Sequence, residues 1–137
     1  MILNLAAAWL IHWPLWMLLF FGVGLIFQDR VTLAAGASVA NEFAGQEIEI
    51  EDRDVYLELA VVSDAAPTTT SPIFTLVTGP DIVARNRVMS EINRFPQYPE
   101  DVTITDAVGG FQRKILQLTN SDSVSHVIRI LAKTTPI

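Results

Sequence analysis

The chain contains no cysteine, and it has no charged side chain before Asp29. Without cysteine it can have no disulfide framework, no thiolate metal site and no cysteine nucleophile. Basic residues are also few, because 9 Lys and Arg stand against 15 Asp and Glu and the formal net charge is −6. A surface that neutralises nucleic-acid phosphates must be basic, so we expect no nucleic-acid partner.

Sequence motifs for catalysis and ligand binding are missing as well. There is no glycine-rich phosphate loop, no histidine pair with metal-ligand spacing and no serine-centred nucleophile elbow. His126 falls in a segment expected to be a strand, where a satisfied structural role is favoured over that of a catalytic base. We therefore predict a protein that is not an enzyme and that uses no cofactor, no metal and no small-molecule substrate.

The amino-terminal part consists of an uncharged apolar run of 23 residues, from Leu5 to Phe27. As a helix this run would reach roughly 34 Å, enough to cross a hydrocarbon core of about 30 Å. It lacks the basic flank of an export signal and is longer than the apolar core of one. We expect residues 1–28 to form a hydrophobic helix that crosses a membrane or, alternatively, packs inside a protein bundle. Basic residues near the run are too few to predict its orientation.

Four side chains within this run follow helical i, i+3, i+4, i+7 spacing: Trp9, His12, Trp13 and Trp16. On a helix they would share one face over roughly 10 Å. An interfacial aromatic belt should be narrower than that. The spacing therefore predicts an assembly face that packs against another helix or subunit.

His12 is also a candidate cofactor ligand, because ionisable residues within membranes are often functional. The pattern of Ala8, His12 and Trp16 resembles the pigment-binding core of bacterial light-harvesting polypeptides, and the resemblance implies that His12 is a ligand. Pro14 departs from that pattern, and antenna polypeptides carry no large acidic domain. A neutral histidine bonded to headgroups, water or a carbonyl freed by Pro14 is the favoured interpretation.

After Phe27 the hydrophobic pattern changes from continuous to alternating. Residues 47–51 read Glu-Ile-Glu-Ile-Glu, which on a strand places the glutamates on one face and the isoleucines on the other. A polar turn at 52–54 and an alternating segment at 55–61 complete a predicted hairpin. We interpret Glu47, Glu49 and Glu51 as a solvated face or as an edge protected by charge.

Further strands are expected at residues 31–39, 73–78, 102–105, 113–119 and 124–132. Residues 81–93 are ambiguous between a short helix capped by Asp81 and an extended segment. Six or seven short strands joined by polar turns predict an antiparallel β-sandwich or jelly-roll-like domain over residues 29–137. Arg85, Arg87 and Arg94 are either ordinary solvated arginines or inter-subunit contacts to the glutamate face of another copy.

The stretch from Leu76 to Ile137 shows a strand, an arm, a proline-rich crossing and two closing strands. This order is similar to that of small β-sandwich virion proteins of bacteriophages, over roughly residues 31–137 and without a diagnostic motif. The similarity implies a capsid-associated role, and the apolar run would suit a phage with an internal membrane.

We therefore predict a non-enzymatic structural protein that anchors or builds a multi-subunit assembly, most simply a virion protein of a membrane-containing bacteriophage. Its expected partners are a lipid bilayer, copies of itself and other subunits. The alternative is an accessory single-pass subunit of a respiratory or photosynthetic complex in the bacterial inner membrane.

Overall fold

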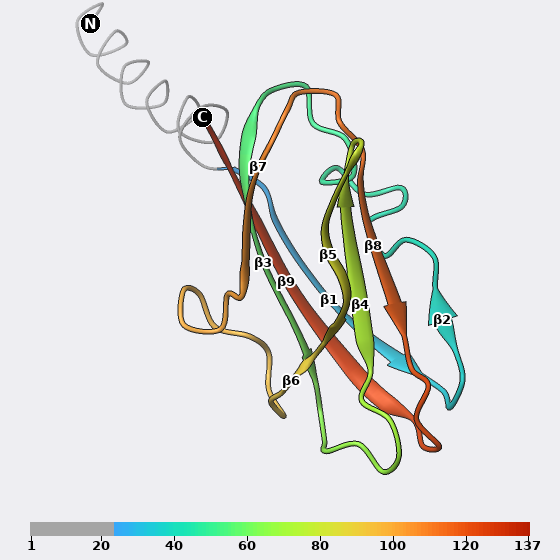
Figure 1. Ribbon diagram of the computed structural model, residues 1–137. Coiled ribbons are helices and arrows are strands. Elements are labelled where there is room, and N and C mark those ends of the chain that lie inside the picture. The colour runs from blue at the N-terminus through green and yellow to red at the C-terminus, as the bar shows by residue number, and fades with distance from the viewer. Residues whose placement is uncertain (1–23) are drawn as a thin grey trace, which may run out of the picture.

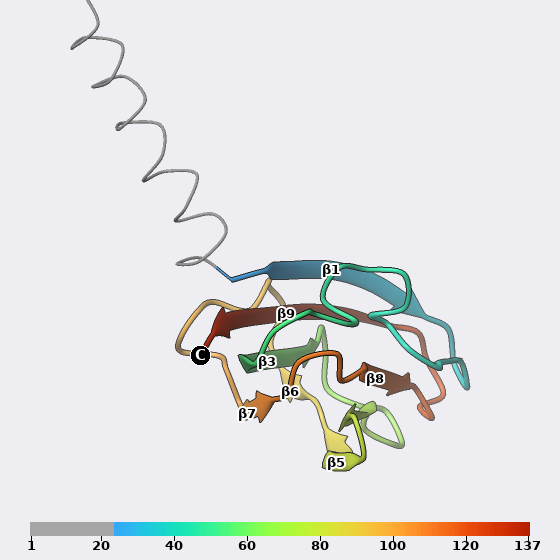
Figure 2. The same cartoon turned by 90° about the horizontal axis from the view of Figure 1, so that it is seen from above.

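A computed structural model describes residues 24–137, which form two packed β-sheets (Figure 1). The strands are β1 (Ile26–Leu33), β2 (Ser38–Val39), β3 (Val55–Ser63), β4 (Ile73–Thr78), β5 (Asp81–Val88), β6 (Ser90–Glu91), β7 (Ile104–Val108), β8 (Lys114–Thr119) and β9 (His126–Pro136). One sheet has the order β1-β9-β3-β6, with β7 also paired to β3. The other has the order β2-β8-β4-β5. In Figure 2, β1 and β9 of the first sheet lie above β8 and β5 of the second.

Nearly all strand pairs are antiparallel, and strands far apart in the sequence form the centre of the first sheet. Strand β9 pairs with β1 on one side, from Ile26↔Lys133 to Leu33↔His126. On its other side it pairs with the whole of β3. The exception is the short parallel contact between β3 and β6. The amino-terminal strand is therefore held by the last strand of the chain.

The core lies between the two sheets and follows the period-two alternation of the strands. Leu57 and Leu59 of β3 face Leu116 and Leu118 of β8, and all four side chains are buried. Full burial of one such leucine contributes about 1.5–3 kcal/mol relative to exposure. The side of β3 and β9 that faces away from this core is covered by residues 92–103, where Tyr98 stacks under Lys133 and donates to Glu58.

The fold class expected from the sequence, a hydrophobic helix followed by a sandwich, is wrong as stated. Residues 24–137 are mainly β and contain no helix. Within this described part there is accordingly no helix with the length and apolar character needed to cross a membrane. Residues 1–23, and with them most of the expected helix, lie outside the described part of the chain.

The end of the apolar run belongs to the sandwich. Strand β1 begins at Ile26 and crosses the expected domain boundary between residues 28 and 29. Phe27 turns inward and meets Phe43 edge to face, with ring centroids 5.4 Å apart. Leu25 and Thr134 exchange backbone and side-chain hydrogen bonds at the start of β1. The hydrophobic pattern alone did not reveal this strand, because its partner β9 lies about a hundred residues further along the chain.

The predicted hairpin of residues 47–51 with β3 is also wrong. Residues 42–49 form successive turns, and β3 pairs with β7 and β9 instead. Ile48 is buried while Ile50 is exposed, so the two isoleucines do not share a face. The turns are closed by backbone hydrogen bonds such as Gln46 N–H to the Phe43 carbonyl. Burial of Phe43 outweighs the local alternation.

Other predicted segments differ in detail. Residues 73–78 form β4 as expected. Of the two alternatives for residues 81–93, the extended one is confirmed for residues 81–88, which form strand β5. The expected strand at 31–39 is broken by a turn at Gly36, whose φ of +76° suits glycine. The residues before the turn belong to β1 and those after it to β2, and these two strands lie in different sheets.

Candidate functional site

The candidate site is the proximal end of the sandwich, which we define as the end where Gly24 and Leu25 lead into β1. The ends of β9 and β7 and the starts of β3 and β8 also lie here, as the strand registers show. In Figure 1 this is the upper end, where the carboxy terminus is marked. The opposite end, with the β3–β4 and β8–β9 loops, is called the distal end below.

Leu25 is tied tightly to the body at the proximal end. Its backbone N–H donates to Thr134 Oγ1 over 3.2 Å, and the Thr134 N–H donates back to the Leu25 carbonyl over 2.9 Å. The Thr134 hydroxyl in turn donates to Glu51 Oε1 over 2.8 Å. Gly24 packs so closely that a Cβ there would lie 1.3 Å from the Thr134 carbonyl oxygen. No flexible linker therefore separates residue 24 from the sandwich.

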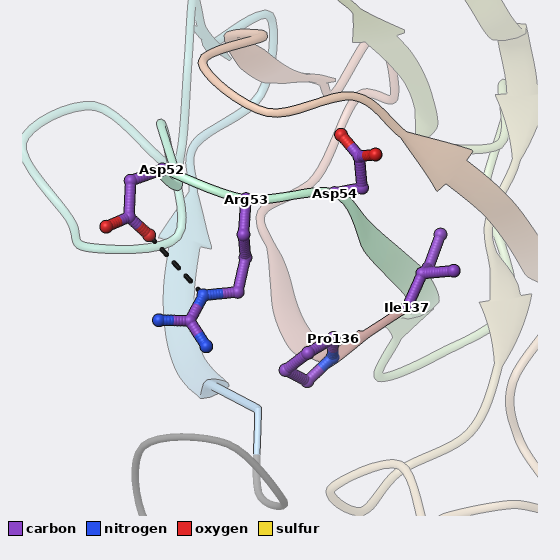
Figure 3. Close-up of a pocket in the computed structure, with 5 residues that line it drawn as sticks. All are labelled: Asp52, Arg53, Asp54, Pro136 and Ile137. Atoms are coloured by element: carbon purple, nitrogen blue, oxygen red, sulfur yellow. Dashed lines mark hydrogen bonds and ion pairs between the residues drawn. The ribbon is translucent and has the colours of Figure 1, made fainter.

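Residues 50–54 connect the other parts of this end. The Phe111 N–H donates to the Glu51 carbonyl over 2.7 Å, and the Gly110 N–H donates to Asp54 Oδ1 over 2.8 Å. The Ile137 N–H donates to the Asp54 carbonyl over 3.1 Å. Together with Pro136 and Ile137, residues 52–54 line a shallow depression (Figure 3). The β7–β8 loop and the carboxy-terminal residues are thus fixed to one short segment.

Large apolar side chains are exposed around this segment. Phe111 is 75% exposed, Ile26 is 62% exposed and Ile50 is 45% exposed. Phe111 also has a φ of +62°, in the left-handed region that non-glycine residues seldom adopt. Ile50 bridges to Arg113, two residues beyond Phe111. The proximal end therefore presents apolar groups from separate segments of the chain.

A buried ion pair lies beneath this surface. The Lys114 ammonium is buried, and it donates to the Ile48 carbonyl and to Glu51 Oε2, each over 3.0 Å. Because Glu51 also accepts from Thr134, one carboxylate links β8, β9 and the turn region. An unpaired buried ammonium would cost several kcal/mol, on the order of 3–5. Loss of either partner would therefore destabilise the proximal end.

A second polar cluster lies at the distal end, around His126. The His126 ring is 1% exposed, with Nε2 2.6 Å from Asp122 Oδ2 and Nδ1 3.1 Å from both Asp64 Oδ1 and Ser63 Oγ. The residue types are those of a hydrolase triad, but Ser63, His126 and Asp122 are all buried. Substrate has no access to the serine hydroxyl in this arrangement, so the cluster joins two loops instead.

The electrostatics of that cluster favour a protonated imidazole. Burial lowers the pKa of His126, but the hydrogen bonds and charges of Asp122 and Asp64 outweigh burial and raise the pKa above its ordinary 6.5. The hydrogen bond from His126, and then the backbone amides of residues 68, 69 and 123, hold the pKa of Asp122 well below its ordinary range. The cluster is a charged clasp between the β3–β4 and β8–β9 loops.

A carboxylate pair on the β1 side is a third perturbed group. Burial, and then the hydrogen bond and charge of Asp29, raise the pKa of Glu42 from 4.5 to about 8. Glu42 therefore retains its proton at neutral pH and donates it towards Asp29. Among residues 24–137, three or more His, Asp or Glu side chains nowhere gather in a way that could hold a metal ion.

The predicted site residues are distributed differently from their expected pattern. Trp9, His12, Trp13 and Trp16 lie outside the described residues. Glu49 accepts from the Asn41 amide and lies 3.7 Å from Arg113, and Glu51 pairs with Lys114, while Glu47 is exposed. The three glutamates are therefore not one solvated face.

The three predicted arginines also have different surroundings. Arg94 pairs with Asp101 inside the chain, whereas Arg85 and Arg87 are exposed on β5. Contacts of Arg85, Arg87 and Arg94 with the glutamates of another subunit stay a prediction.

Sequence reasoning missed Phe111, Thr134 and Asp122. For Phe111, the glycine pair that precedes it, Gly109-Gly110, was available as a signal. For Asp122, the signal was its i, i+4 spacing from His126. Nothing local distinguishes Thr134 from Thr135, because only the pairing of β9 with β1 and β3 decides which one faces Glu51.

Comparison with known proteins adds no relative: no family model matches the chain, and searches of curated proteins and of solved structures found no significant match.

Proposed function

We propose that this protein is a non-enzymatic structural subunit that holds a β-sandwich against a lipid bilayer within a multi-subunit assembly. The observation that carries the proposal is the direct passage from the uncharged run into β1. Leu25 is pinned to Thr134, and Gly24 has no room for a side chain. The environment that surrounds the apolar run therefore also contacts the proximal end of the sandwich.

The apolar run supplies the driving force in this proposal. Transfer of apolar surface out of water is favourable by about 25 cal/mol of free energy per Å². No charged residue before Asp29 opposes that transfer. A flexible linker would leave the sandwich free to turn, whereas here Leu25 is bonded directly to Thr134 of β9. A short connection of this kind serves a scaffold, in which neighbouring subunits must meet at reproducible angles.

Within this class, a virion protein of a membrane-containing bacteriophage is the form we favour. The support is the similarity in strand order noted above, together with exposed edge strands through which copies can meet laterally. Strand β5 is such an edge, and its Arg85 and Arg87 side chains are exposed. The alternative, an accessory subunit of a membrane complex, depends on His12, and no observation on residues 24–137 favours it.

The test is the behaviour of the full chain without detergent. We expect it to float with phosphatidylcholine vesicles in a density gradient and to occur in many copies per native particle. The variant Leu18→Arg/Leu19→Arg should abolish flotation. A matched control, Gln28→Arg/Thr32→Arg, adds the same charge to exposed positions of β1 and should float normally. A stable, vesicle-free monomer of the unmodified chain in the absence of detergent would contradict the proposal.

A further inference from the structure

The exposed apolar side chains of the proximal end come from three segments fixed to one another. Phe111 and Ile50 are adjacent to Glu51, which accepts the Phe111 N–H and the Thr134 hydroxyl. Ile26 follows Leu25, which is bonded to Thr134. The three side chains are 45–75% exposed although the backbone beneath them is held rigidly. Single exposed apolar side chains are common, but several gathered at one end of a domain mark an interaction surface.

Phe111 shows the strongest local sign of such a role. Its φ of +62° would suit glycine, and the two residues before it are glycines. Backbone strain of this kind persists only where surrounding bonds hold it, as the Phe111–Glu51 and Gly110–Asp54 hydrogen bonds do here. The fold thus holds a large aromatic ring in solvent at a position where glycine would be easier to accommodate.

The charges of this end indicate what kind of partner fits. Asp52 is largely exposed and Asp54 is exposed, while Arg53 pairs with Asp52 and Arg113 lies beside Glu49. The proximal end therefore carries no excess positive charge. Such a surface has no attraction for anionic headgroups, which recruit clusters of Lys and Arg. Apolar groups next to mixed charges instead fit a zwitterionic lipid interface, where side chains such as Phe and Leu enter the boundary between headgroups and acyl chains.

We propose that Phe111, Ile50 and Ile26 form a lipid-contact surface that inserts into the headgroup region of a zwitterionic bilayer. This inference rests on the proposed function and extends it, because it states which end of the sandwich touches lipid and through which side chains. The occupant follows from chain continuity, since the uncharged residues before Asp29 reach the sandwich at this same end.

The test uses site-directed nitroxide labels on the full chain, which has no cysteine of its own. Single variants Phe111→Cys and Ile50→Cys are labelled and bound to phosphatidylcholine vesicles. The control is Val88→Cys, which is 60% exposed on β5 and lies at the distal end, opposite the start of β4. Two proximal labels are used because a labelled cysteine at position 111 must still adopt a positive φ and can distort its loop. The label at position 50 gives an independent measurement.

Relative to position 88, we expect labels 111 and 50 to collide at least about twofold less with aqueous nickel chelate and more with oxygen. Adding phosphatidylserine should leave that difference unchanged. Aqueous collision rates equal to those at position 88, on chains that do float, would overturn the contact surface but not the proposed function. Spin–spin broadening between 111 labels would overturn it in favour of a second copy. Failure to float would overturn both.

Discussion

His126 Nε2 lies 2.6 Å from Asp122 Oδ2 in the buried clasp that joins the β3–β4 and β8–β9 loops. Asp122 also accepts the backbone amides of Thr68, Thr69 and Ser123, so it is held as an ionised acceptor. A carboxylate cannot donate, and His126 therefore supplies the proton. This contact makes the stability of the sandwich depend on pH.

We predict that the free energy of unfolding falls as pH rises from about 5 to about 8. The raised pKa of His126 means that the folded chain holds the proton more tightly than the unfolded chain does. This stabilisation is complete below pH 6.5 and is lost as pH rises through the folded-state pKa. Glu42 acts in the same direction, because its pKa rises from 4.5 to about 8 on folding.

At lower pH the direction reverses, because the stabilisation from Asp122 is present above 3.8 and is lost as pH falls towards its depressed pKa. Urea unfolding between pH 3 and 9 measures the whole profile. In Glu42→Gln, the fall of the unfolding free energy with pH up to pH 8 should be less steep. In His126→Gln, the part of that fall near and above pH 6.5 should be absent. A profile that rises steadily from pH 5 to 8 would contradict both assignments.

The edge-to-face contact of Phe27 and Phe43 predicts an energetic coupling between the end of the apolar run and the core. A double-mutant cycle with Phe27→Leu and Phe43→Leu should give a coupling of about 1 kcal/mol. The same Phe27 variant combined with Val88→Ala, at the distal end, should be additive. Additivity in the first cycle would mean that Phe27 does not belong to the folded sandwich.

Gly24→Ala should loosen the joint between the apolar run and β9. A Cβ at that position overlaps the Thr134 carbonyl, so either the backbone shifts or the Leu25–Thr134 bonds break. We expect a loss of about 1–3 kcal/mol in unfolding free energy and faster amide exchange at Thr134. Gly109→Ala is the control, because its Cβ would meet only Gln112 Cγ at 3.4 Å. Unchanged exchange at Thr134 in Gly24→Ala would argue against the rigid joint.

Phe111→Gly should separate stability from lipid contact. Glycine adopts the φ of +62° without strain, so the free energy of unfolding should rise by about 1 kcal/mol. The same change removes the exposed ring, and lipid protection of the neighbouring Ile50 position should decrease. Thermal unfolding and the Ile50 nitroxide label provide the two measurements. A large loss of stability would show that the ring packs within the protein.

Glu51→Gln should destabilise the sandwich by about 3 kcal/mol, because it leaves the buried Lys114 ammonium without an anion. Adding Lys114→Met should restore part of that loss, since no buried charge then remains. Glu47→Gln is the control at an exposed position and should change stability by less than about 0.5 kcal/mol. Equal effects at positions 47 and 51 would support the single solvated face that the sequence pattern suggested. Chemical denaturation of the three variants and the unmodified chain measures this.

The positions of several strands were predictable because their signal is local. Residues 73–78 alternate in the sequence and form β4 over the same residues, and residues 113–119 and 124–132 overlap β8 and β9. The region around Glu49 shows the limit of that signal. Its alternation suits a strand, but burial of Phe43 and the Asn41 and Arg113 contacts of Glu49 favour turns.

The sequence by itself determined that this chain has an uncharged apolar beginning, an acidic remainder and enough alternating segments for a β-sandwich. Only the tertiary structure decided where along the apolar run the sandwich begins and which groups surround that point. The physical reason is sequence distance: Leu25 meets Thr134 across 109 residues, Lys114 meets Glu51 across 63 and His126 meets Asp64 across 62. Local periodicity carries no information about such pairs, whereas backbone pairing and burial determine them.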